Sequence, residues 1–379
     1  MDTGVFRIDH ASDVYVVRSY YNEDGSDLLA LGDEHSVEVY QISPSSSKRL
    51  ASFHIGTRVT AIAWSPRTSS PSGSDGWLIE IAAAGIDFGL HLLTKSVSLE
   101  EHIFPFGGGL SGHHGRVNDM SFCGGRDREN ARYVATVSDD KMLMVWDLHP
   151  TLDISSRIPS PEISTNNSSS LPSPRPQPTA YVITFPHALT TVSSHPASSK
   201  EFLVTDCRGS IFLTDWRTDP ELTEQGSWRH STLVELVEPH AVADSLLGAS
   251  LHWSRFAAWR RDNVDIIGAT YGPRFAIWDM SRLRGGRPTH TGTSFPDTGH
   301  AFRWCPTNPD YFAIAAHSIN KGAVLHIHNV GYVHAQPSVI NVAPHPLRIR
   351  DFDFMALCGQ PLLAVAFGRQ VAVFSLGDE

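Results

Sequence analysis

The amino-acid sequence predicts an all-β fold in which seven four-stranded sheets form one closed ring. A short segment of alternating apolar residues occurs seven times along the 379 residues. A histidine stands 27 to 39 residues before the end of each of these segments. The beginning of the chain supplies one further strand, and the end of the chain lacks one. Repeats of this length are typical of folds built from identical structural units.

The alternating segments each follow a turn that contains a polar residue or glycine. They end at Tyr40, Leu93, Trp146, Thr214, Trp278, His328 and Phe374. Their apolar pairs are Val37/Val39, Leu90/Leu92, Leu143/Val145, Ile211/Leu213, Phe275/Ile277, Leu325/Ile327 and Val371/Val373. Side chains two positions apart lie on the same face of a strand, so this pattern predicts β-strands. Helical periodicity is nowhere sustained.

The repeated histidines mark the entry to each unit. They are His10, His54, His113, His187, His240, His300 and His345. A second apolar stretch follows, with sequences such as VTAIAWSP, VNDMSFCG, LTTVSSHP and GHAFRWCP. Each unit therefore reads as several short antiparallel strands. One such sheet cannot bury both of its apolar faces alone, whereas a ring of sheets packs each against its neighbours.

The third unit carries the most specific motif. It contains Gly112-His113, then SDD at residues 138–140, then Trp146-Asp147, and a second Trp-Asp pair stands at 278–279. These motifs resemble the WD-repeat (WD40) β-propeller, although the units that end at 93–94 and 328–329 are degenerate. The resemblance implies that His113, Asp140 and Trp146 form a buried hydrogen-bonded chain with a structural role. The seven entry histidines are too far apart around a ring to bind one metal ion.

The ends of the chain predict how the ring closes. Only residues 375–379 follow the last alternating segment, too few for the outermost strand of a seventh sheet. The segment VFRI, at 5–8, is a strand without a sheet of its own. We expect it to pair into the last sheet, because a closed ring leaves only short, protected edges. The prediction is one domain over 1–379.

One segment interrupts the pattern. Residues 149–178 are rich in serine, proline and asparagine and nearly free of bulky apolar residues. Such a composition predicts a disordered insertion between the third and fourth sheets. Ser-Pro pairs at Ser43, Ser160 and Ser173 lie in polar loops, where either a solvated linker or a phosphorylation site is possible.

Charge and cysteine usage exclude several classes of partner. The formal net charge is −10, which gives no basic surface for binding a phosphate backbone, so direct contact with nucleic acid is not expected. Four widely separated cysteines without a CxxC pair indicate a reducing compartment. No apolar run approaches the length of a membrane span, and the first residues are polar. We expect a protein of the cytosol or nucleus without membrane insertion.

No motif indicates catalysis. FGGGLSGHHG, at 106–115, lacks the GK[ST] of a phosphate-binding loop and the G-x-S-x-G of a hydrolase, so a flexible link is the better interpretation. His326 and His328 share a strand face but have no third metal ligand nearby. The sequence predicts no catalytic residue, metal, cofactor or small-molecule substrate, and hence no enzyme.

A candidate partner-binding site lies in FAAWRRDNVD. Trp259, Arg260 and Arg261 fall in a predicted turn and are of residue types enriched in binding hot spots. The alternative is that Trp259 packs inward and caps its blade.

Four segments carry a closer resemblance. They are FHIGTRVTAIAWSP, VSDDKMLMVWDL, IWDMSRLRGGRPTHTGTSFPDTGHAFRWCPTNPDYFAI and LHIHNVGYVHAQP. Together they resemble the thirty-seven-kilodalton WD-repeat nucleoporin family of the Y-shaped nuclear pore scaffold complex. The most distinctive motifs are RPTH followed by FRW, and IHNVG in place of a Trp-Asp ending. The 149–178 segment departs from what the family resemblance leads us to expect.

The resemblance implies a non-catalytic structural subunit of the outer ring of the nuclear pore, located at the nuclear envelope. Its implied partners are the large arm nucleoporin of the Y complex, through the helical region of that protein, and the other nucleoporins of the complex. The alternative is a WD-repeat adaptor or substrate receptor of a ubiquitin-ligase or chromatin complex, which binds a peptide at the mouth of the central channel.

Overall fold

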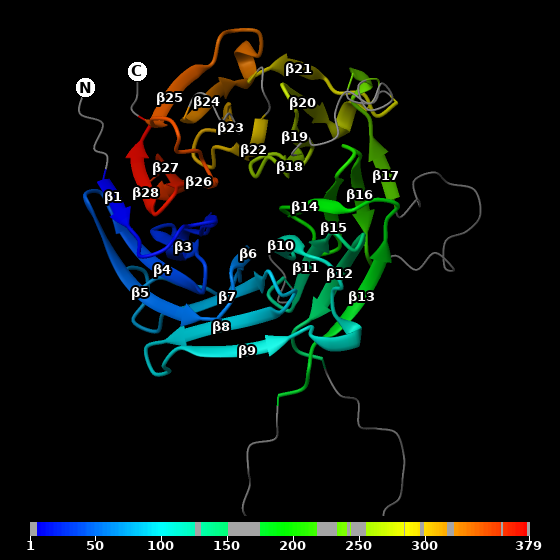
Figure 1. Cartoon of the computed structure of the whole chain (residues 1–379). Helices are drawn as coiled ribbons and strands as arrows, with labels where there is room; N and C mark the ends of the chain where they lie inside the picture. The colour runs from blue at the N-terminus through cyan, green and yellow to red at the C-terminus, as the bar shows by residue number, and fades with distance from the viewer. Residues whose placement is uncertain are drawn as a thin grey trace, which may run out of the picture.

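A computed structural model describes residues 6–125, 130–150, 175–217, 233–240, 243, 255–283, 285–295, 299–316, 322–357 and 359–376. These residues form seven four-stranded antiparallel sheets, arranged as blades around a central axis (Figure 1). The prediction of an all-β, seven-bladed propeller is confirmed. Most of the predicted insertion at 149–178 lies outside the described residues, so its disorder stays a prediction.

Each blade is a meander that begins at the axis and ends at the rim. The innermost strands are β2 (Val16–Ser19), β6 (Val59–Trp64), β10 (Val117–Phe122), β14 (Leu189–Ser194), β18 (Arg255–Trp259), β22 (Gly299–Trp304) and β26 (Asp351–Leu357). The second strands are β3 (Leu28–Gly32), β7 (Leu78–Gly85), β11 (Tyr133–Ser138), β15 (Glu201–Asp206), β19 (Ile266–Tyr271), β23 (Tyr311–Ala316) and β27 (Gln360–Phe367).

The third strands are the alternating segments that the sequence predicts. They are β4 (Ser36–Ser43), β8 (Leu90–Ser96), β12 (Met142–Asp147), β16 (Ile211–Asp215), β20 (Arg274–Asp279), β24 (Ala323–Asn329) and β28 (Gln370–Ser375). The outermost strands are β5 (Ser46–His54), β9 (His102–Phe106), β13 (Thr179–Thr184), β17 (Leu233–Leu236), β21 (His290–Thr293), β25 (Ser338–Ala343) and β1 (Phe6–Asp9). The described residues also contain four short 3-10 turns, which are η1 (Glu23–Gly25), η2 (Gly109–Ser111), η5 (Met280–Arg282) and η6 (Val330–Tyr332).

The core is divided into seven hydrophobic clusters, one between each pair of neighbouring blades. In β12, Leu143 and Val145 pack toward the fourth blade, whereas Met144 and Trp146 pack toward the second. Alternation therefore buries both faces of the sheet, which is the physical reason why an isolated blade is not stable.

Indole side chains fasten some innermost strands to their neighbours. The Nε1 of Trp64 donates to the carbonyl oxygen of Arg18 at 2.9 Å, and the Nε1 of Trp304 donates to that of Ala258 at 3.0 Å. Each bond joins the end of one innermost strand to the innermost strand before it, so these tryptophans fix the spacing of blades around the channel.

The ring closes with strands from both ends of the chain. Strand β1 pairs antiparallel with β28, with Phe6 opposite Val373 and Ile8 opposite Val371, and Figure 1 shows β1 in blue beside β28 in red. This confirms the predicted closure, with the strand over 6–9 and Val5 outside the described residues. Ile8 is buried between the last blade and the first, so closure adds to the core as well as to the hydrogen-bonded ladder.

Two further observations concern membrane-spanning helices and the cysteines. None of the helices in the described part of the chain is long and apolar enough to cross a membrane. Cys123, Cys207 and Cys305 form no disulfide bond with one another, whereas Cys358 lies outside the described residues.

Candidate functional site

The third blade contains the hydrogen-bonded chain that the WD-repeat resemblance implies. His113 Nδ1 lies 2.8 Å from the Oδ2 of Asp140, and His113 Nε2 lies 2.7 Å from the hydroxyl of Thr136. The Nε1 of Trp146 donates to the same hydroxyl at 2.9 Å. The structure thus brings the three predicted residues together, with Thr136 as the link that sequence reasoning missed. The feature of the sequence that could have indicated Thr136 is a hydroxyl residue on the second strand of the blade, where it pairs with Met144 on the third strand.

The turn that carries Asp140 holds its carboxylate in place. Burial raises the pKa of Asp140, but hydrogen bonds from His113 and from the backbone N–H groups of His114 and Met142 outweigh it and keep that pKa below its usual range. The carboxylate is therefore ionised at neutral pH and accepts from all three donors.

The glycine-rich link into this blade passes close to the indole ring of Trp146. Gly107 has a φ of 63°, and a Cβ at that position would lie 2.9 Å from the indole ring. A side chain there would be strained in both backbone and packing. The segment connects β9 to β10 and includes the turn η2, so its glycines have a structural reason.

The chain of His113 is not repeated at every entry histidine. In the first blade His10 lies 3.1 Å from Glu38, which also accepts from the hydroxyl of Tyr40 at 2.6 Å. His54, His240 and His345 are exposed, His187 is half-buried, and the His300 side chain lies outside the described residues. The hydrogen-bonded chain of the third blade is therefore not shared by all seven entry histidines. An exposed imidazole finds water as its partner and needs no fixed acceptor.

Replacing Asp140 by alanine is expected to lower the free energy of unfolding by about 2 to 3 kcal/mol, because the buried imidazole of His113 and two backbone N–H groups lose their acceptor. Urea unfolding followed by tryptophan fluorescence measures this loss. The control is Asp139→Ala in the same turn, which removes an exposed carboxylate and is expected to cost less than about 1 kcal/mol. Equal losses for the two variants would contradict the role of the chain.

His326 and His328 share one hydroxyl. The Oγ of Ser294 lies 3.1 Å from His326 Nδ1 and 3.0 Å from His328 Nε2. The imidazoles stack on Phe295 and Phe312, with ring centroids 3.5 Å and 5.1 Å apart respectively. Burial, with His326 as a second cause, lowers the pKa of His328 to about 4. Within the described ranges, no group of three or more histidine, cysteine, aspartate or glutamate side chains could hold a metal ion.

The neutral state of His328 predicts a loss of stability in acid. Its folded-state pKa of about 4 lies below the value of 6.5 for an unfolded chain, so only the unfolded state takes up a proton between these values. Stability falls as the pH drops from 6.5, by about 3 kcal/mol in total near pH 4. Urea unfolding at pH 7 and pH 5 tests this. Between these pH values, His328→Asn is expected to lose less stability than the wild type. His345→Asn, at an exposed site, is the control and is expected to lose as much stability as the wild type.

The central channel contains a network of buried charges from several blades. Arg18 on β2 binds Asp351 on β26 and lies 3.5 Å from Asp119 on β10. Arg303 on β22 lies 3.6 Å from Asp351 and 3.7 Å from Asp353. Burial opposes the charge on Arg18, but its carboxylate partners raise the pKa of Arg18 above its usual range. No motif indicates this network, because its members are separated by up to 335 residues.

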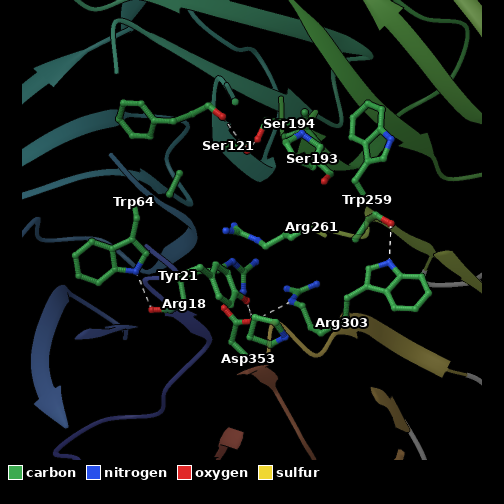
Figure 2. Close-up of a pocket in the computed structure, with 18 of the residues that line it drawn as sticks. Arg18, Tyr21, Trp64, Ser121, Ser193, Ser194, Trp259, Arg261, Arg303 and Asp353 are labelled. Carbon is green, nitrogen blue, oxygen red and sulfur yellow. Dashed lines mark hydrogen bonds and ion pairs between the residues drawn. The ribbon is translucent and has the colours of Figure 1, made fainter. Parts of the chain in front are cut away.

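A cavity of about 420 Å³ lies at the mouth of the channel, where the innermost strands end (Figure 2). Its wall includes four members of this network, namely Arg18, Asp119, Arg303 and Asp353. The wall also includes Tyr20, Tyr21, Trp64, Trp259 and Trp304. It is the concave, mixed polar and aromatic kind of surface on which binding sites are usually found.

Two of the three predicted partner-binding residues line this cavity. Trp259 ends β18 rather than lying in the predicted turn, and it packs inward with 5% exposure. Arg260 lies 2.8 Å from Asp262, and Arg261 extends over the ring of Tyr21, 4.0 Å from its centroid. The structure thus places Trp259 and Arg261 in the cavity wall. Their role in partner binding stays a prediction.

Comparison with characterised proteins finds two similar sequences. Nucleoporin Nup37 of Mus musculus is 23% identical over 346 residues, which cover 88% of this chain and 87% of the mouse protein. Nucleoporin Nup37 of Homo sapiens is 23% identical over 346 residues, which cover 88% of this chain and 86% of the human protein. No protein-family model matches the chain. The similarity to these nucleoporins confirms the resemblance that the sequence motifs indicate.

Proposed function

We propose that this chain is a non-catalytic structural subunit of the outer ring of the nuclear pore, and that it docks on the helical region of the large arm nucleoporin of the Y complex. The observation that carries the proposal is the similarity to Nup37 across nearly the whole of both chains. A similarity of that extent is not confined to one blade or to one short motif. The protein is accordingly placed at the nuclear pore, with other nucleoporins as its partners.

The architecture supports a scaffold role. Seven blades closed by a strand from the other end of the chain make a rigid body. A rigid surface loses little conformational entropy when a partner binds, so more of the contact energy appears as affinity. A scaffold subunit needs no convergent acid, base or nucleophile.

The test is affinity purification of the tagged chain, combined with fluorescence imaging in the cell. We expect nucleoporins in stoichiometric amounts and a signal at the nuclear rim. Recovery of a cullin-linker protein or of histones, with no rim signal, would contradict the proposal. Those results would instead support an adaptor that binds a peptide, a function favoured by the cavity at the channel mouth.

A further inference from the structure

Asp353, which lines the channel-mouth cavity, is hydrogen-bonded on both of its carboxylate oxygens. Asp353 accepts from the backbone N–H groups of Ser19 and Phe354, each at 3.0 Å, and from the hydroxyl of Tyr21. It lies beside Arg303 as well. A carboxylate offers about four lone-pair positions, and these partners occupy them. Asp353 therefore has little capacity left to attract a cationic guest.

The other two acids of the network also have partners. Asp351 accepts from the N–H groups of Val17 at 3.0 Å and Phe352 at 2.9 Å, and it contacts two guanidinium groups. Asp119 accepts from the N–H of Val192 at 3.1 Å and faces Arg18. Asp262, at the rim, pairs with Arg260.

Arg261 is different from every other charged group in the cavity wall. Among the described residues, no carboxylate lies within ion-pair distance of its guanidinium, whose contact is with the ring of Tyr21. The side chain is surrounded by protein and yet accessible to water, because it extends into the middle of the open cavity (Figure 2). Its N–H groups remain available, and the hydroxyl of Ser193, which also lines the cavity, has no partner in the described part of the chain.

Of these two groups, the guanidinium of Arg261 only donates hydrogen bonds, whereas the hydroxyl of Ser193 can donate or accept. Donors that surround an open space favour a guest with acceptor oxygens, and a guanidinium can bind a carboxylate with two parallel hydrogen bonds. The space of about 420 Å³ is large enough for a side chain, and the wall contains tyrosine and tryptophan, which are typical of protein-binding hot spots.

We infer that the mouth of the channel binds an acidic side chain of a protein partner, with Arg261 as the group that receives its carboxylate. This inference rests on the proposed function, since the partner is then a nucleoporin of the same complex. Under this inference, Trp259 and Arg261 act as part of the wall of a binding pocket, and not as a turn on the outer surface.

The test compares nucleoporin recovery by the full tagged chain and three variants. Arg261→Gln is expected to lower the amount of recovered nucleoporin at least about tenfold, because it removes the charge and the two parallel donors. Arg261→Lys keeps the charge and is expected to recover an intermediate amount. The matched control is Arg282→Gln, in an exposed arginine whose side chain is 81% accessible and which lies outside the cavity wall.

Salt dependence supplies a readout that a purely structural role would not change. As NaCl rises from about 50 to about 300 mM, a range that includes physiological ionic strength, the amount of nucleoporin recovered by the wild type is expected to fall steeply. The amount recovered by Arg261→Gln is expected to fall less. Equal thermal midpoints for the wild type and Arg261→Gln would show that the variant is folded. If Arg261→Gln does not fold, recovery of nucleoporin by Arg261→Lys is compared with recovery by the wild type in the same assay, and equal recovery would contradict the inference.

The outcomes separate the two proposals. Equal recovery and equal salt dependence for the wild type and Arg261→Gln would overturn the inference and leave the scaffold function standing. An equal loss in Arg282→Gln would overturn it as well, because the effect would then follow from net charge. Failure of the wild type to recover any nucleoporin would overturn the proposed function itself.

Discussion

Replacing Asp353 by alanine is expected to lower the free energy of unfolding by about 3 to 5 kcal/mol. Asp353 is 1% exposed, and its removal leaves the hydroxyl of Tyr21 without its acceptor and deprives the guanidinium of Arg303 of one of its two carboxylate partners. The N–H of Ser19 on the neighbouring blade loses its partner too. Loss of one member of a buried ion pair costs more than the pair itself contributes, because the remaining charge stays buried.

Chemical denaturation of the purified protein measures this loss. Asp262→Ala is the control, since it breaks the ion pair of a half-exposed rim carboxylate and is expected to cost less than about 1 kcal/mol. Asp353→Asn keeps an acceptor oxygen for Ser19, so its loss of unfolding free energy is expected to lie between those of Asp353→Ala and Asp262→Ala. A loss for Asp353→Ala that equals that of Asp262→Ala would show that the network contributes nothing to the closed ring.

Removal of residues 1–9 is expected to have the largest effect on the fold, at least about 5 kcal/mol of the free energy of unfolding. The deletion removes the ladder between β1 and β28 and the buried side chain of Ile8. It also leaves β28 as an open edge beside the first blade, and such an edge pairs readily with other chains. We expect a truncated protein that unfolds at lower denaturant concentration and associates in solution.

Point variants separate packing from backbone pairing. Ile8→Asp places a charge in the cluster between the last and first blades and is expected to approach the deletion in its effect. Arg7→Ala, at an exposed position on the opposite face of the same strand, is expected to change stability by less than about 1 kcal/mol. A truncated chain that stays monomeric with unchanged stability would show that β1 does not close the ring.

The sequence alone predicted the seven blades because their pattern is local. A strand with both faces buried needs apolar residues at alternate positions, and that requirement is visible within six residues, as at Leu143 and Val145. Closure by the first strand was predictable as well, because a count of strands leaves the last blade one short. Both depend on spacing along the chain and on nothing beyond it.

Local pattern also indicated part of the third blade's chain, but not all of it. His113, Asp140 and Trp146 stand in motifs with fixed spacing, whereas Thr136 is one hydroxyl among many on the second strands. Its role follows from the register that places it between an imidazole and an indole. The exposure of His54 and His345 could not be read from the repeat either, because a histidine at the same position is buried only where a neighbour supplies an acceptor.

The sequence by itself therefore determined the fold, its closure and the resemblance to nucleoporins, since each is written in short segments. Only the tertiary structure decided which charges meet. Arg18, Asp119, Arg303 and Asp353 come from four blades, and nothing near each residue in the chain shows that the ring brings its side chain to one axis. The position of Arg261, without an ion-pair partner among the described residues, also follows from that assembly, because it depends on where the carboxylates of other blades lie.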